Sequence, residues 1–349
     1  MSASVQELHD TAREILANGR GILAADESNS TMTKRLEGVG IESTEESRLK
    51  FRELMVSADG ADQWIGGVIL YDETIRQSTS EGTPVPQFLA SRGIVPGSKV
   101  YTGAKPLALS PDEKVTEGLD GLRDRLEEYV DMGARFAKWR GVIQIGDGLP
   151  TDHCLKANAH ALARYAALCQ EAGLVPIVEP ETMMDGDHPI DRSEDATQRT
   201  LHHVFRELFE QQVAPEGMLL KVNMVMAGYD APEQVGVEEV AKRTLDCLRR
   251  VVPAAVPGVV FLSGGQDDQR SSAHLNAMSQ ADDLPWDISF SYARALQGLP
   301  MEIWHGEDAN VEAAQEAFQH RARLTAAARR GEYSDDMEQE RGQLAGVGS

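Results

Sequence analysis

The chain has 349 residues, 41% of them hydrophobic and 26% charged, a composition that fits a globular protein and excludes collagen-like, fibrous and wholly disordered chains. Its 34 basic and 56 acidic residues give a net charge of −22, which repels nucleic acids and anionic lipids, so neither is an expected partner. No stretch of about 18 apolar residues occurs, and Cys154, Cys169 and Cys247 are too few and too irregularly spaced for a disulfide framework. We therefore expect a cytoplasmic protein that spans no membrane.

The first predicted element is an amphipathic helix near the start of the chain. Ser4 and Glu7 have the spacing of a capping box, and Leu8, Ala12 and Ile15 follow at helical spacing. Because one face of this helix is apolar, we expect it to pack against the rest of the fold.

Short apolar runs then alternate with longer helical patterns. Eight of these runs are predicted strands: 21–25, 65–71, 99–102, 135–139, 174–178, 218–223, 259–262 and 288–291. Strand followed by helix, eight times over, predicts a (β/α)8 TIM barrel of the α/β class, with a doubly wound open sheet as the alternative. No linker divides the chain, so we expect one barrel domain over residues 1–330, including the N-terminal helix, and a polar, flexible tail over 331–349.

Reactive side chains occur where the predicted strands end. In barrels of this kind the active site is built at the C-terminal ends of the strands. The runs carry lysines, carboxylates, arginines and a glycine-rich turn at or near their ends, with Lys221 in the middle of the sixth run: Asp26, Lys138, Arg140, Glu179, Glu181, Lys221, Ser263-Gly264-Gly265, Ser291 and Arg294. We expect these residues to converge on one site.

Lys221 lies in the apolar run LLKVNMV. Burial and a second nearby cation lower the pKa of a lysine, and the neutral amine can then attack a ketone and form a Schiff base. Lys138, which has Arg135 and Arg140 near it in sequence, suits the role of that second cation. The alternative is a lysine whose stem lines the barrel while its ammonium group reaches solvent or pairs with an acid.

Three carboxylates are candidates for proton transfer. Glu179 and Glu181 follow the fifth strand, where imine formation and hydrolysis would need a proton donor and acceptor. The alternative interpretation is that Glu179 and Glu181 form ion pairs with the two lysines, and such pairs are compatible with catalysis. Asp26 directly follows the run GILAA; it could accept the proton of a substrate hydroxyl group, or equally cap the next helix.

The turn Ser263-Gly264-Gly265 and Arg294 have the features of an anion site. Exposed backbone N–H groups and a guanidinium group after the seventh and eighth strands match the place where barrels bind phosphate. The string LSGGQ also resembles the signature of ABC-type ATPases, but no GxxxxGK[ST] loop and no GxGxxG turn accompanies it. We therefore expect no nucleotide cofactor.

A metal site is not expected either. The nearest candidate is Asp185, Asp187 and His188, which a turn containing Gly and Pro explains better. The sequence therefore favours chemistry on a lysine amine without metal or cofactor.

Taken together, these motifs resemble class I fructose-bisphosphate aldolases, the metal-independent Schiff-base enzymes of glycolysis and gluconeogenesis. The resemblance covers almost the whole chain and rests on segments in the family's order and spacing: GILAADES, IGGVILY, GARFAKWR, GLVPIVEPE, LLKVNMV, FLSGGQ and SYARALQ. It implies reversible cleavage of fructose 1,6-bisphosphate into dihydroxyacetone phosphate and glyceraldehyde 3-phosphate, in a protein that forms homotetramers.

The resemblance also implies residue roles. The Schiff base would form on Lys221 and Glu179 would be the main acid and base, with Glu181, Lys138 and Asp26 in support. The sugar phosphate would be bound by residues at both ends of the site: Arg140 near the substrate, Ser263, Gly264, Ser291 and Arg294 at the C1 phosphate, and Ser28, Thr31 and Arg35 at the C6 phosphate.

Two departures from the family pattern concern phosphate binding. Where many relatives read VDKG, this chain reads VYTG, so Thr102 replaces a lysine that the resemblance places near the C6 phosphate. Lys105, three residues on, is a candidate substitute, and Ala293 replaces the glycine of SYGR. Two alternatives therefore stay open: an aldolase that acts mainly on another ketose phosphate such as fructose 1-phosphate, and a non-catalytic scaffold or binding protein derived from the enzyme.

Overall fold

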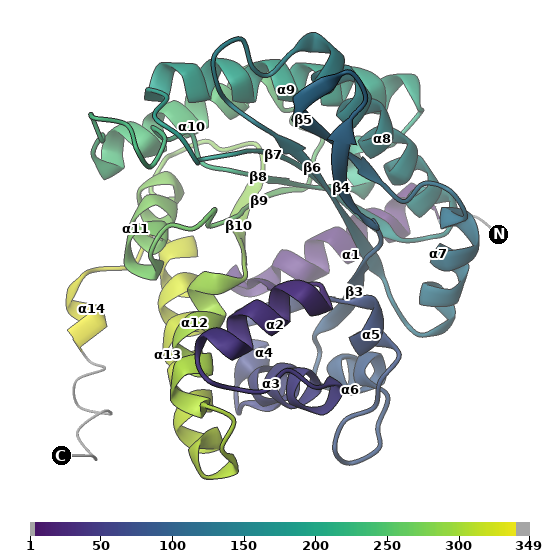
Figure 1. Cartoon of the computed structure of the whole chain (residues 1–349), viewed down its shortest axis with the longest axis vertical. Helices are drawn as coiled ribbons and strands as arrows, with labels where there is room; N and C mark the ends of the chain where they lie inside the picture. The colour runs from purple at the N-terminus through teal and green to yellow at the C-terminus, as the bar shows by residue number, and fades with distance from the viewer. Residues whose placement is uncertain (1–3, 340–349) are drawn as a thin grey trace.

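Eight parallel strands close into a barrel in the computed structural model, which describes residues 4–339 (Figure 1). The barrel strands are β1 (Gly21–Ala25), β2 (Ile65–Leu70), β3 (Val95–Lys99), β6 (Phe136–Ile143), β7 (Val175–Thr182), β8 (Leu219–Val222), β9 (Gly258–Phe261) and β10 (Asp287–Tyr292). They are ordered β1-β2-β3-β6-β7-β8-β9-β10, and β10 pairs with β1 to complete the ring. The closed ring confirms the predicted TIM barrel and excludes the open-sheet alternative.

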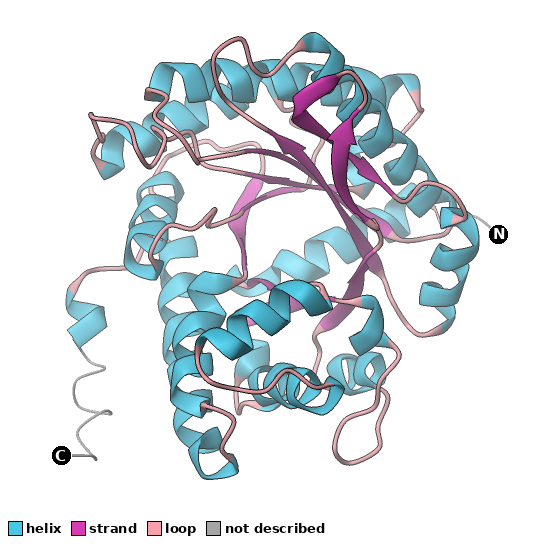
Figure 2. Cartoon of the chain, viewed as in Figure 1, coloured by secondary structure: helices cyan, strands magenta, loops and turns pink. Residues whose placement is uncertain are grey.

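Helices surround the barrel, as Figure 2 shows. Their bounds are α1 (Val5–Leu16), α2 (Asn29–Gly38), α3 (Glu45–Ser57), α4 (Ala61–Trp64), α5 (Asp72–Ile75), α6 (Val85–Ser91), α7 (Leu122–Asp131), α8 (Asp152–Glu171), α9 (Ile190–Glu210), α10 (Val237–Val251), α11 (Asp268–Ser279), α12 (Arg294–Trp304), α13 (Val311–Arg329) and α14 (Asp336–Gln339). None of the helices described between residues 4 and 339 is long and apolar enough to cross a membrane. Cys154, Cys169 and Cys247 are all buried and unpaired.

Helix α1 forms as predicted and packs against the barrel. The Ser4 hydroxyl group accepts from the Glu7 amide at 3.2 Å, and the Glu7 carboxylate accepts from the Ser4 amide at 2.7 Å. The apolar side chains of α1 join those that fill the barrel interior: Leu8, Ala12, Ile15, Leu16, Ile22, Ala24, Ile69, Val95, Phe136, Val175, Ile177, Leu219 and Val260. A Cβ atom on Gly66 would lie 2.0 Å from the carbonyl oxygen of Ile15, so glycine is required there.

The third strand was predicted about four residues too late. Strand β3 covers Val95–Lys99, whereas the prediction covers 99–102. One of its interior positions is Gly97, where a Cβ atom would lie 2.4 Å from the Phe136 ring. The large ring fills the space there, so β3 has a weak apolar pattern of its own. Strands β6 and β7 each continue four residues beyond the prediction, so Glu179 lies within a strand rather than after one.

The connection from β3 to β6 contains an antiparallel hairpin that was not predicted. Its strands are β4 (Gly103–Leu107) and β5 (Ser110–Glu117), and Figure 1 shows them beside α8. Most side chains of the hairpin are polar and at least partly exposed, so it carries little hydrophobic signal.

The predicted flexible tail begins with a packed stretch. The side chain of Tyr333 is buried, its amide donates to Asn276 at 2.9 Å, and its hydroxyl group donates to Glu338 at 2.9 Å. Residues 331–339 are therefore held by specific contacts, because a buried aromatic ring anchors them. Residues 340–349 of the predicted tail lie outside the described residues.

Candidate active site

Strand alternation carries the reactive side chains into the barrel mouth. In a strand every second side chain faces the same side. On β7 the interior positions Val175 and Ile177 are followed by Glu179 and Glu181, and on β6 Phe136 is followed by Lys138 and Arg140. The same alternation applies to the other strands, because Ile22 and Ala24 lead to Asp26 and Leu219 leads to Lys221. Apolar residues thus fill the barrel, and charged ones continue the same rows at its C-terminal end.

These rows meet in a cavity of about 1030 Å³ at the C-terminal mouth. It is lined by most of the predicted site residues: Asp26, Ser28, Thr31, Lys138, Arg140, Glu179, Glu181, Lys221, Ser263, Gly264, Ser291 and Arg294. The structure therefore brings together the predicted catalytic set and both predicted phosphate-binding groups, with one exception, Arg35.

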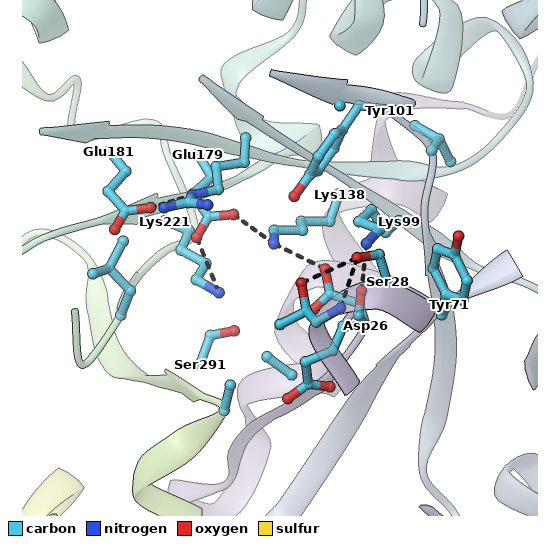
Figure 3. Close-up of a pocket in the computed structure, with 18 of the residues that line it drawn as sticks. Asp26, Ser28, Tyr71, Lys99, Tyr101, Lys138, Glu179, Glu181, Lys221 and Ser291 are labelled. Atoms are coloured by element: carbon cyan, nitrogen blue, oxygen red, sulfur yellow. Dashed lines mark hydrogen bonds and ion pairs between the residues drawn. The ribbon is translucent and has the colours of Figure 1, made fainter. Parts of the chain in front are cut away.

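A chain of ion pairs crosses the cavity (Figure 3). The Nζ atom of Lys221 lies 3.2 Å from Oε1 of Glu179, and the Nζ atom of Lys138 lies 2.9 Å from Oε2 of the same carboxylate. Lys138 also donates to Oδ2 of Asp26 at 3.0 Å. All four side chains are buried. One carboxylate is thus shared by two lysines, and a second carboxylate holds the far side of Lys138.

The two lysines have opposite pKa shifts. Burial lowers the pKa of Lys221 and the nearby Lys138 ammonium group adds to this, while Glu179 only partly opposes it. Burial also disfavours charge on Lys138, but Asp26 and Glu179 outweigh it and raise its pKa well above the ordinary value. Lys221 is therefore the amine suited to nucleophilic attack, and Lys138 is a fixed cation.

Both buried carboxylates favour the ionised form. Burial alone would raise the pKa of Glu179, but Lys138, Lys221 and Arg140 outweigh burial and lower it. Asp26 behaves alike: burial acts to raise its pKa, and Lys138 and Lys99 lower it below the ordinary value. Each carboxylate can accept a proton from a group that lies beside it.

Glu181 and Arg140 pair with each other at the edge of this cluster. The Arg140 guanidinium group donates to the Glu181 carboxylate. Glu181 thus pairs with an arginine, whereas the alternative interpretation of the sequence expected it to pair with the lysines.

The predicted C1-phosphate group lies at the ends of β9 and β10. Gly264 has φ +62° and Gly265 has φ +102°, a left-handed pair that turns the chain after β9. A Cβ atom on Gly265 would lie 3.1 Å from a terminal nitrogen of Arg294, so the guanidinium group packs closely against this turn. Within the described residues the buried hydroxyl group of Ser291 has no hydrogen-bond partner, and it faces the same cavity.

A second loop braces the glycine turn. Tyr229, which was not predicted, donates from its hydroxyl group to the carbonyl oxygen of Gly264 at 3.1 Å. Its own backbone amide donates to Met184 at 2.9 Å. The conformation of the turn therefore depends on the loop after β8.

Two hydroxyl groups that follow β1 also line the cavity. Ser28 caps α2, and its hydroxyl group lies 3.0 Å from that of Thr31. Arg35 does not reach the cavity: its guanidinium group pairs with Glu27 and donates to Gln297 at 3.0 Å. Because Glu27 itself lines the cavity, Arg35 lies beside the lining, and its role at the C6 phosphate stays a prediction.

Lys99 is a site residue that the sequence reasoning missed. It is the last residue of β3, it is buried, and its Nζ atom donates to the carbonyl oxygen of Asp26 and lies 4.5 Å from the centre of the Tyr71 ring. Placing the strand four residues late concealed that Lys99 ends a strand. Thr102 lines the cavity, whereas Lys105, the candidate substitute, is exposed on the hairpin and does not line it.

The fold and the site define a class of enzyme: a TIM barrel whose C-terminal mouth holds a buried lysine, paired acids and a glycine-rich turn, the arrangement of enzymes that form a Schiff base with a ketone. The family model for class-I fructose-bisphosphate aldolase matches residues 7–345. The chain belongs to this family.

Individual relatives agree along nearly the whole chain. It is 53% identical over 331 residues to "Probable fructose-bisphosphate aldolase class 1" of Xanthomonas campestris pv. campestris, covering 95% of this chain and 99% of that protein. It is 48% identical over 339 residues to the chloroplastic fructose-bisphosphate aldolase 1 of Arabidopsis thaliana, covering 97% of this chain and 84% of that protein. The solved structure of fructose-bisphosphate aldolase from Plasmodium falciparum, in complex with TRAP and a small-molecule inhibitor, superposes with a TM-score of 0.93 at 43% identity, covering 95% of this chain and 96% of that one.

Proposed function

We propose that this enzyme cleaves fructose 1,6-bisphosphate reversibly into dihydroxyacetone phosphate and glyceraldehyde 3-phosphate through a Schiff base on Lys221. The observation that carries the proposal is the buried Lys221 amine, 3.2 Å from Glu179 and close enough to the Lys138 cation to have its pKa lowered. Lowering the pKa favours the neutral amine, which is the form that attacks a ketone.

Each residue of the cluster has a step in this mechanism. The Lys221 amine adds to the C2 ketone, and Glu179 transfers the protons that release water and leave a protonated imine. This imine draws electrons from the C3–C4 bond. As that bond breaks, the C4 hydroxyl group gives its proton to Asp26 and becomes the aldehyde. Protonation of the resulting enamine at C3 and hydrolysis then release dihydroxyacetone phosphate and free Lys221.

The charge of Lys138 supports these steps without a covalent role. It lies between Asp26 and Glu179 and keeps both carboxylates ionised, ready to accept protons. Arg140 forms an ion pair with Glu181 on the other side of the cluster and fixes the position of that carboxylate. Acid and base are thus positioned by fixed cations before the substrate binds.

The two phosphate groups would bind to different parts of the mouth. Ser263, Gly264, Ser291 and Arg294 would bind the C1 phosphate, while Ser28 and Thr31 would face the C6 phosphate, with Lys99 as the cation on that side. Strand order separates Lys99 from the Ser263-Gly264 turn, because β3 and β9 lie on opposite sides of the eight-stranded ring, whereas Ser28 and Thr31 follow β1, which neighbours β10.

Reductive trapping tests the proposal. Borohydride added with dihydroxyacetone phosphate should give a covalent adduct on the peptide that contains Lys221, and Lys221→Met should abolish it. An adduct that persists in Lys221→Met would contradict the assignment. EDTA should leave cleavage unchanged, whereas a loss of activity that zinc restores would indicate a metal-dependent mechanism instead.

Substrate preference is a separate part of the proposal. Thr102 and Ala293 alter the phosphate contacts, so we expect a smaller preference for the bisphosphate over fructose 1-phosphate than in relatives that carry lysine at position 102. Cleavage of both sugars measures this preference directly. A chain that binds them and cleaves neither would instead support the scaffold or binding-protein alternative.

We also propose that the enzyme is a cytoplasmic homotetramer. The three buried, unpaired cysteines suit a reducing compartment, and the tetramer follows from the family resemblance. Light scattering after size-exclusion chromatography tests the assembly, and a mass near that of one chain would contradict it.

A further inference from the structure

A tyrosine that the predicted mechanism does not use lies against the ion-pair cluster. Tyr101 follows β3 by two residues and continues its interior row, after Val95, Gly97 and Lys99. Its ring centre lies 5.7 Å from Nζ of Lys138 and 5.4 Å from Nζ of Lys99. In Figure 3 the ring stands above Lys138 and the hydroxyl group points into the cavity.

The backbone around Tyr101 is fixed on both sides. The Val100 amide donates to the carbonyl oxygen of Lys138 at 3.1 Å, and the Thr102 amide donates to that of Glu117 at 2.9 Å. Gly118 packs so closely that a Cβ atom on it would lie 3.1 Å from Cα of Tyr101. Position 101 is therefore held by the barrel on one side and by the hairpin on the other.

The ring is held as well. Tyr101 packs against Trp139 with ring centres 6.1 Å apart, and Trp139 stacks on Tyr165 at 5.5 Å. The Tyr165 hydroxyl group donates to the carbonyl oxygen of Ala137 at 2.7 Å, which anchors this row of rings to β6. The side chain of Tyr101 has little freedom to turn away from the cavity.

The hydroxyl group is available to a ligand. Within residues 4–339 it has no hydrogen-bond partner, although the charges of Lys138, Asp26 and Glu179 act on it. Burial raises the pKa of Tyr101, so the phenol keeps its proton and acts as a donor. It thus faces the groups that handle the proton of the C4 hydroxyl group in the mechanism above.

We infer that Tyr101 is a catalytic residue whose hydroxyl group donates a hydrogen bond to the C4 oxygen of the substrate. The inference rests on the proposed function. During cleavage this oxygen gives its proton to Asp26 while Tyr101 keeps its own. In the reverse direction the same hydrogen bond polarises the aldehyde and stabilises the alkoxide that forms as the enamine attacks. A donor aimed at a developing oxyanion contributes most in a buried site such as this one.

Two reactions separate this role from a structural one. Dihydroxyacetone phosphate has no C4, so its adduct with Lys221 and the exchange of its C3 proton with solvent do not involve the proposed hydrogen bond. Cleavage of fructose 1,6-bisphosphate and of fructose 1-phosphate does, and the C4 oxygen is the same in both sugars. Tyr101→Phe keeps the ring contacts and removes only the hydroxyl group.

Tyr101→Phe should lower kcat for cleavage of both sugars by the same factor, about tenfold to a hundredfold, while proton exchange and borohydride trapping stay within about twofold of the unsubstituted enzyme. Tyr333→Phe, at a tyrosine remote from the cavity, is the matched control and should change none of these rates. Unchanged cleavage in Tyr101→Phe would overturn the inference, and so would an equal loss of cleavage and exchange. Failure of the unsubstituted enzyme to form the Lys221 adduct would instead contradict the proposed function.

Discussion

Glu179 Oε1 lies 3.2 Å from Lys221 Nζ, and both side chains are almost fully buried. Two effects oppose each other at this lysine. The carboxylate favours the charged form of Lys221, and burial disfavours it. Burial outweighs the carboxylate, so the pKa of Lys221 is lowered although an anion is in contact. The anion can then serve as a proton carrier without locking the amine in its charged form.

Replacing Glu179 with glutamine should separate these two effects. Glu179→Gln removes an anion that raises the pKa of Lys221, so that pKa should fall further and the neutral amine should persist to lower pH. The pH midpoint for borohydride trapping of dihydroxyacetone phosphate, taken at the end point of a long incubation, should therefore move down. Cleavage should nevertheless slow by about a hundredfold or more, because the proton carrier is lost.

The surface residue Glu210, which pairs with Arg206, provides a control of the same chemistry. Glu210→Gln should leave both the trapping profile and the rate of cleavage unchanged. A trapping midpoint that stays in place or rises in Glu179→Gln would show that this carboxylate does not set the charge state of Lys221.

The sequence was sufficient for the barrel because apolar runs alternate with helical patterns, and for the charged cluster because reactive residues occur at the ends of those runs. Once β6 and β7 are recognised, the interior rows place Lys138 and Glu179 at the mouth without knowledge of their neighbours. The glycine-rich turn and Arg294 indicated one anion site, and the resemblance to aldolases added Ser28, Thr31 and Arg35 as predicted residues of a second. Of these, Ser28 and Thr31 line the cavity as expected.

The features of the fold and site that the sequence did not predict depend on contacts between segments far apart in the sequence. The space beside Gly97 is filled by Phe136 from the next strand in the ring, so β3 has only a weak hydrophobic pattern. Lys99 and Tyr101 were consequently overlooked. Arg35 has the right spacing from Ser28, but its partners are Glu27 and Gln297, and the latter lies 262 residues away.

The bond from Tyr229 to Gly264 should matter for phosphate binding. Tyr229→Phe removes the hydroxyl group that holds the carbonyl oxygen of Gly264, which frees the turn to reorient its N–H groups. We expect KM to rise about three- to tenfold, the scale of one lost hydrogen bond, with kcat nearly unchanged. Because both sugars carry a C1 phosphate, steady-state kinetics should give the same factor for each. A fall in kcat at constant KM would indicate a role in the chemical steps instead.

Position 102 tests the distal phosphate site. Thr102 lines the cavity without a charge, so Thr102→Lys adds a cation on the side where the C6 phosphate would bind. The ratio of kcat/KM for fructose 1,6-bisphosphate to that for fructose 1-phosphate should increase several-fold. Lys105→Ala is the control variant, because Lys105 is exposed and lies outside the cavity. Its loss should leave the ratio unchanged. A ratio that does not respond to Thr102→Lys would show that Lys99 and the hydroxyl groups already suffice.

The stability of the fold at acidic pH should depend on His274. This side chain is fully buried on α11, and its Nδ1 lies 2.7 Å from Oε1 of Gln266, the last residue of the LSGGQ segment. Burial, with help from Arg270, lowers the pKa of His274 from 6.5 to about 4, and Asp267 opposes this only partly. The folded protein therefore keeps this ring neutral at pH values where the unfolded chain protonates it.

The sign of the effect follows from that difference. A lowered folded pKa means that the stabilisation is present above pH 6.5 and is lost as the pH falls toward 4, because the unfolded state binds the extra proton. For a folded pKa of about 4 and an unfolded pKa of 6.5, the free energy of unfolding should fall by about 2 kcal/mol between pH 7 and pH 5. Urea unfolding at the two pH values should reveal it.

The asparagine in His274→Asn can still donate to Gln266 but cannot titrate. The free energy of unfolding of this variant should therefore fall less between pH 7 and pH 5 than that of the unsubstituted protein. Some dependence should remain, because burial also lowers the pKa of His188. His160→Asn, at a largely exposed histidine that pairs with Glu207, is the matched control and should keep the full dependence. If His274→Asn loses as much stability between pH 7 and pH 5 as the unsubstituted protein, then His274 is not the group whose protonation opposes folding in acid.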